Sequence, residues 1–68
     1  MNKAKWNELP PMVRHEIDTL RSFIRSAVVM GDRKDADKRR AELRGYTHGL
    51  MDAGLITEAE AEALCKEC

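Results

Sequence analysis

The sequence predicts an all-α protein: a helical hairpin of two long helices with a short C-terminal helix, which pairs with a second copy to form a bundle. Apolar residues recur at helical spacing from Val13 to Ala27, a charged helical segment follows Gly31, and a helix-capping pattern begins at Thr57. With 68 residues, the chain is expected to form one small domain over 1–68. Such small cores usually gain stability from a disulfide, a metal or a partner subunit.

The first predicted helix spans about residues 12–30. Residues 6–11 are interpreted as a lead-in, because Pro10 disfavours helix at the residue before it and Pro11 suits a first helical turn. Gly31 is expected to cap the C-terminus. The helix carries an apolar seam of alternating four- and three-residue spacing, made by Val13, Ile17, Leu20, Ile24 and Ala27. We expect this seam to exceed what one hairpin can bury, which favours a homodimer.

The second predicted helix spans about residues 34–53, with Asp32 or Asp35 as its N-cap and Gly54 as its stop. An apolar arc along it consists of Ala36, Leu43, Tyr46, Thr47 and Leu50. Beside the arc, small residues four apart form a ridge of Ala41, Gly45, Gly49 and Ala53. Two interior glycines cost roughly 1 kcal/mol each. A smooth ridge that lets another helix approach closely, within the chain or between subunits, would offset this cost; alternatively, Gly45 breaks the helix.

The third predicted helix spans about residues 58–67. Gly54 suits a left-handed helix stop, and Thr57 with Glu60 matches a capping box, in which each side chain bonds the other residue's amide. A face expected to be buried carries Ala61, Leu64, Cys65 and Cys68.

Residues 52–60, Asp-Ala-Gly-Leu-Ile-Thr-Glu-Ala-Glu, resemble the short helical-hairpin module called SHOCT, in which a helix is followed by Gly-x-Ile-Thr-Glu and an acidic helix. Ala61 stands where that module usually has a bulky aromatic residue. The compact run from Arg44 to Glu58 is also similar in style to small accessory proteins of bacteriophages and prophages. These resemblances imply a non-enzymatic interaction module.

The only cysteines, Cys65 and Cys68, form a CxxC pair. Three interpretations remain open for it: an apolar helix face or frayed tail, a metal or redox site, and an intersubunit disulfide. A zinc site needs four ligands, and His15 and His48 lack zinc-finger spacing. Neither histidine has a neighbouring residue pattern that orients a catalytic base, and no glycine-rich phosphate loop is present. We therefore expect no metal, no cofactor and no enzymatic activity.

The charges balance overall, with 12 basic and 12 acidic residues, but are unevenly distributed. Residues 1–44 carry eleven bases and seven acids, whereas 45–68 carry one base and five acids. This polarity favours antiparallel self-association or oriented docking on a charged partner. The segment 32–44 holds six bases, but four acids interrupt them, so a solvated helix face competes with nucleic-acid binding.

These observations favour a small cytoplasmic protein-binding module, a phage-encoded inhibitor or modulator of a larger host or phage protein. The arginines expected to bind this partner are Arg14, Arg21, Arg25, Arg39, Arg40 and Arg44. The alternative is an auxiliary nucleic-acid-binding regulator that uses the face Arg33–Arg44, and a weaker one is a metal- or redox-responsive switch at Cys65 and Cys68. No apolar run has the length of a membrane span or a signal peptide, so no membrane partner is expected.

Overall fold

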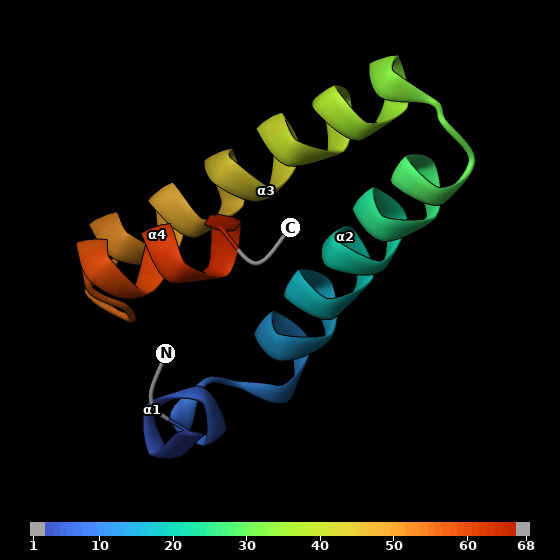
Figure 1. Ribbon diagram of the computed structural model, residues 1–68. Helices are drawn as coiled ribbons and strands as arrows, with labels where there is room; N and C mark the ends of the chain where they lie inside the picture. The colour runs from blue at the N-terminus through green and yellow to red at the C-terminus, as the bar shows by residue number, and fades with distance from the viewer. Residues whose placement is uncertain (1–2, 67–68) are drawn as a thin grey trace.

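Residues 3–66, the part of the chain that the computed structural model describes, contain four α-helices. They are α1 (Lys3–Glu8), α2 (Pro11–Val29), α3 (Arg33–Asp52) and α4 (Glu58–Lys66). Within residues 3–66 there is no strand, so the all-α prediction is confirmed. Figure 1 shows α2 and α3 diverging from the turn that joins them, while α4 folds back along the C-terminal half of α3.

The ends of α2 and α3 differ by one residue from the ranges 12–30 and 34–53 expected from the sequence. Helix α4 begins at Glu58 as expected, and the expected last residue, Glu67, lies outside the described residues. Gly45 does not break α3, which continues through it to Asp52.

Helix α1 corrects the interpretation of residues 6–11 as a lead-in. Pro10 restricts only the residue before it, so the six residues Lys3–Glu8 remain free to form a helix that ends before Leu9. The Leu9 amide donates to the Trp6 carbonyl at 3.2 Å, which closes the last turn. Leu9 is buried in the core, and Trp6 packs against it. The short helix therefore adds apolar cover to one end of the molecule.

Four of the five seam residues of α2 are buried within a single chain, and Val13 is half-buried. Ile17 and Ile24 have 0% exposed surface, and Leu20 and Ala27 are also buried. Ile17, Leu20 and Ile24 share one cluster with residues from outside the α2–α3 hairpin, so the expectation that the hairpin alone would leave the seam exposed does not by itself call for a second chain. The buried apolar cluster comprises Leu9, Ile17, Leu20, Ile24, Leu43, Leu50, Ile56 and Leu64, with Val13, Tyr46, Ala61 and Cys65 packed against it. Burial of the seam therefore does not require a homodimer, which stays a prediction.

The turn between α2 and α3 is built by a left-handed glycine and a helix cap. Gly31 has φ +72°, and its amide donates to the Val28 carbonyl at 3.1 Å. The Asp32 amide donates to the Ala27 carbonyl at 2.9 Å, which completes a Schellman motif. The Asp32 carboxylate then accepts from the Asp35 amide at 3.0 Å, so Asp32 is the N-cap of α3. The turn is thus held by hydrogen bonds at both helix ends.

The connection between α3 and α4 repeats this construction and confirms the capping prediction. Gly54 has φ +77°, and the Leu55 amide donates to the Leu50 carbonyl at 2.9 Å. The Thr57 amide donates to Glu60 Oε1 at 2.8 Å, and the Glu60 amide donates to Thr57 Oγ1 at 3.1 Å. These reciprocal bonds are the predicted capping box.

Candidate functional site

The six arginines expected to form one partner-binding surface lie on two sides of the α2–α3 pair. The Arg39 guanidinium lies over the Phe23 ring, 4.7 Å from its centroid, and Arg39 also pairs with Asp35 at 3.6 Å and Glu42 at 3.2 Å. At 100° per residue, Phe23 projects from α2 on the side opposite Arg14. Arg39 therefore connects α3 to the Phe23 side of α2, away from the arginines of α2.

The remaining arginines share the other side, which we call the arginine flank: Arg14, Arg21, Arg25, Arg40 and Arg44. On α2, Arg21 and Arg25 project into the same sector as Val28, which lies two turns after Arg21. Val28 lines a shallow cavity together with Arg40 of α3, which places this sector beside the start of α3. Arg44 follows Arg40 by one helical turn. The flank therefore spans both long helices.

The members of the arginine flank differ in exposure and pairing. Arg25 and Arg44 are exposed and form no ion pair within the described residues. Arg40 pairs with Asp37 at 3.4 Å. Arg14 and Arg21 are half-buried. The freely available positive charge of the flank is thus concentrated on Arg25 and Arg44.

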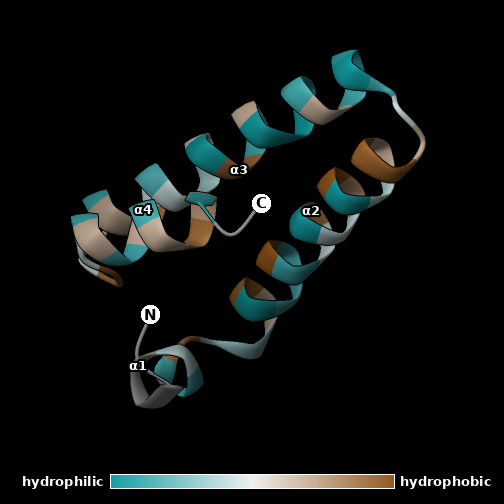
Figure 2. Cartoon of the chain, in the orientation of Figure 1, coloured by the Kyte–Doolittle hydropathy of each residue, from teal (hydrophilic) through white to brown (hydrophobic). Residues whose placement is uncertain are grey.

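A second surface lies at the turn between α2 and α3. Val29 and Met30 are 85% and 81% exposed, and the preceding Val28 is 53% exposed. Figure 2 shows this apolar end of α2 next to the hydrophilic start of α3. The hydrogen bonds of the turn fix the backbone at this end of α2, so the exposed side chains belong to an ordered helix end. Two apolar residues directly before Gly31, outside the seam, were the signal available in the sequence.

Beside these apolar side chains is a shallow cavity of about 350 Å³, which we call the turn cavity. Its walls come from the last turn of α2 and the first two turns of α3. It is lined by Ala27, Val28, Gly31, Asp32, Arg33, Ala36 and Arg40. Arg33 and Arg40, two helical turns apart, supply cations above an apolar floor of Ala27 and Ala36. The carboxylate of Asp32 is already bonded to the α3 amide that it caps.

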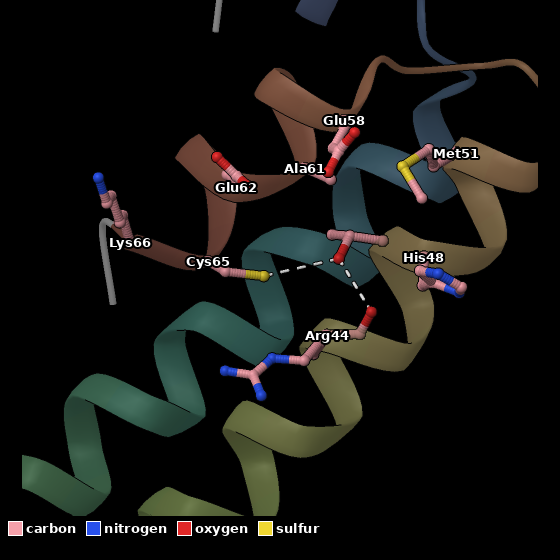
Figure 3. A pocket seen from close by; sticks show the side chains of 9 residues that line it. Arg44, His48, Met51, Glu58, Ala61, Glu62, Cys65 and Lys66 are labelled. Carbon is pink, nitrogen blue, oxygen red and sulfur yellow. Dashed lines mark hydrogen bonds between the residues drawn. The ribbon is translucent and has the colours of Figure 1, made fainter.

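A larger groove of about 570 Å³ lies between α3 and α4 and is lined by side chains of both helices (Figure 3). Thr47 is only 1% exposed, and its hydroxyl lies 3.0 Å from the Leu43 carbonyl and 3.1 Å from the Arg44 carbonyl. Cys65 Sγ lies 3.6 Å from Thr47 Oγ1. Cys65 is a free thiol packed against the core, whereas Cys68 lies outside the described residues. The Cys65 contact therefore joins α4 to α3.

Comparison with protein-family models, curated proteins and solved structures finds no match.

The ridge of small residues faces solvent within this chain. Its members, Ala41, Gly45, Gly49 and Ala53, are all exposed. A Cβ added at Gly45 or at Gly49 would meet no atom within 4 Å. Close packing of the ridge inside the chain is thus excluded, while close packing between two chains stays a prediction.

The histidines and acids of the described segment lie apart from one another. His15 is exposed, and the exposed His48 has its Nδ1 3.7 Å from Asp52 Oδ2. Within residues 3–66, no three His, Cys, Asp or Glu side chains are grouped closely enough to hold a metal ion. On α3, Arg39 pairs with both Asp35 and Glu42. No described helix combines the length and apolar character of a membrane span.

Proposed function

We propose that this chain is a small non-enzymatic protein-binding module that acts by occupying a surface of a larger protein, in the manner of a phage-encoded inhibitor or modulator. The observation that carries the proposal is the arginine flank, which spans both long helices of the α2–α3 hairpin. Arginine is enriched at the hot spots of interfaces, and its planar guanidinium can bind a carboxylate through two parallel hydrogen bonds. Arg25 and Arg44 are the exposed cations from which such pairing starts.

The packing of α2 against α3 supports a rigid presentation of this flank. The seam residues Ile17 and Ile24 are completely buried, and the turn is held by the hydrogen bonds of Gly31 and Asp32. A partner that binds the flank therefore pays little conformational entropy for ordering the backbone. A preformed surface of this kind suits a protein that works by binding alone.

The alternative function, nucleic-acid binding through Arg33–Arg44, is less well supported. Arg39 is engaged by Phe23 and by two carboxylates, and Arg40 is paired with Asp37. Binding to a phosphate backbone requires cations that are free to replace counterions. On the same segment, Arg33, Lys34 and Lys38 remain exposed, but they are accompanied by the carboxylates of Asp32, Asp35, Asp37 and Glu42.

Affinity capture with charge-reversed variants tests the proposal. Tagged wild-type chain is incubated with a lysate of the cells that encode it, and each captured protein is purified and tested for direct binding. We expect Arg25→Glu combined with Arg44→Glu to abolish capture, because both cations are exposed and come from different helices. The matched control reverses Lys34 and Lys38, which are equally exposed, on the outer face of α3.

The circular dichroism and melting temperature of both variants are expected to match the wild type, since none of the four side chains is buried. Unchanged affinity in the Arg25→Glu, Arg44→Glu variant would place the interface elsewhere. If the wild type instead retains duplex DNA with a steep salt dependence and captures no protein, the nucleic-acid-binding function replaces the one proposed here.

A further inference from the structure

We infer that the turn cavity binds a carboxylate side chain of an acidic segment in the partner protein, while Val29 and Met30 contact an apolar residue beside it. This inference rests on the proposed function and names the chemistry of the partner. Two separate features of the same end of the molecule carry it: a cavity with cationic walls, and exposed apolar side chains next to that cavity.

The cavity has the charge and shape that a carboxylate side chain requires. Arg33 and Arg40 lie seven residues apart on α3, so both side chains project over the same cavity of about 350 Å³. Arg33 forms no ion pair within the described residues, whereas Arg40 pairs with Asp37 at 3.4 Å. The apolar floor of Ala27 and Ala36 suits the methylene groups of a glutamate.

The exposed apolar side chains favour a peptide over other anions. Val29 and Met30 are 85% and 81% exposed and adjoin Val28, so three consecutive apolar side chains face water. Contiguous exposed apolar groups mark interaction sites when they form a patch. A nucleic acid or a free phosphate would leave them in water. Asp32, which lines the cavity, and Asp37, which pairs with Arg40, also oppose a polyanion, whereas a single glutamate needs only the unpaired cation of Arg33 with Arg40 beside it. The occupant we assign is therefore an acidic peptide segment with an adjacent apolar residue.

A membrane surface is a less suitable occupant. Valine and methionine lack the amphipathic rings of tryptophan and tyrosine, which anchor proteins at the lipid headgroup level. The exposed apolar group is also confined to one turn and does not extend along an amphipathic helix.

Binding of synthetic peptides to the full chain tests the inference. The probe is a fluorescein-labelled peptide in which pairs of glutamates alternate with pairs of leucines. The control peptide has glutamine in place of every glutamate. By fluorescence anisotropy, the wild type is expected to bind the glutamate peptide about tenfold more tightly than the glutamine peptide, because charged hydrogen bonds to arginine are lost in the control. Arg33→Gln combined with Arg40→Gln is expected to remove this difference.

Val29→Ser combined with Met30→Ser is expected to weaken binding of both peptides about tenfold, since it removes the apolar contact. The matched control, Lys34→Gln combined with Lys38→Gln, removes two exposed charges on the outer face of α3 and is expected to change affinity less than about twofold. Circular dichroism establishes that every variant retains the wild-type helix content.

Four outcomes would overturn the inference: no binding of the glutamate peptide, equal binding of the two peptides, wild-type affinity in the Arg33→Gln, Arg40→Gln variant, or tighter binding to duplex DNA or to phosphatidylserine vesicles. The capture experiment above separates this failure from that of the proposed function. A captured protein that still binds the Arg33→Gln, Arg40→Gln variant would leave the protein-binding function standing and remove only the turn cavity from it.

Discussion

Alanine at Gly45 and at Gly49 is expected to stabilise the chain, which is the sharpest test of the ridge. Both glycines lie inside α3 with negative φ, and the Cβ of an alanine would meet no atom within 4 Å at either position. The substitution therefore costs no packing and removes backbone freedom from the unfolded chain. Each alanine should raise the free energy of unfolding by about 0.5–1 kcal/mol, and the pair by about 1–2 kcal/mol.

Urea and thermal unfolding followed by circular dichroism measure this effect. A gain of 1 kcal/mol corresponds to about 4–8 °C in melting temperature for a domain of this size. The control is Gly54→Ala, the same chemical change at φ +77°, where a left-handed backbone disfavours any Cβ. It should lower the free energy of unfolding by about 1–2 kcal/mol. The same chemical change is thus expected to raise the free energy of unfolding at Gly45 and Gly49 and to lower it at Gly54, because of the three only Gly54 has a left-handed backbone.

A loss of stability in Gly45→Ala and Gly49→Ala would refute this reasoning. If that loss grew with protein concentration while light scattering showed dimers, the ridge would be packed against a second copy, as the homodimer prediction requires. A gain at all concentrations would remove the ridge from any subunit interface.

Three further predictions concern the core, the caps and the Arg39 contact. Ile24→Ala should cost about 2–5 kcal/mol, because its side chain is fully buried, and a loss below 1 kcal/mol in urea unfolding would contradict the core assignment. Thr57→Ala should cost about 0.5–2 kcal/mol by removing the acceptor of the Glu60 amide, with reduced protection of α4 amides in hydrogen exchange; unchanged exchange would argue against the capping box. A double-mutant cycle of Arg39→Gln with Phe23→Leu should give a coupling of about 0.5–1 kcal/mol, and strict additivity would exclude the cation–π contact.

The features that depend on local chemistry could be predicted from the sequence. The seam of α2 follows from apolar periodicity, and the Thr57–Glu60 capping box follows from residue types at fixed spacing. Both depend only on residues within a few turns of one another. The same is true of Gly31 and Gly54, whose positive φ values are demanded by the helix ends that they close.

Features that depend on how helices are rotated against one another were not predictable in this way. Periodicity places Arg39 on a flank of α3, but not beside Phe23, because that contact depends on the relative rotation of α2 and α3. Helix α1 has six residues, too few for a periodic pattern to reveal it. Ile17 and Ile24 share their buried cluster with three residues that lie outside both long helices, Leu9, Ile56 and Leu64. The exposure of Val29 follows from the same arrangement, since it lies outside the covered face.

The order of the helices along the chain has a consequence for how fast the protein folds. The helices that pack most extensively, α2 with α3 and α3 with α4, are consecutive, and connections of three and five residues join them. Chains dominated by such local contacts close only short loops and fold within microseconds to milliseconds. A core this small leaves only about 3–5 kcal/mol of stability, so the chain unfolds often. Each unfolded interval is nevertheless brief, so the exposure of the apolar seam to a protease is set by the free energy of unfolding rather than by slow refolding.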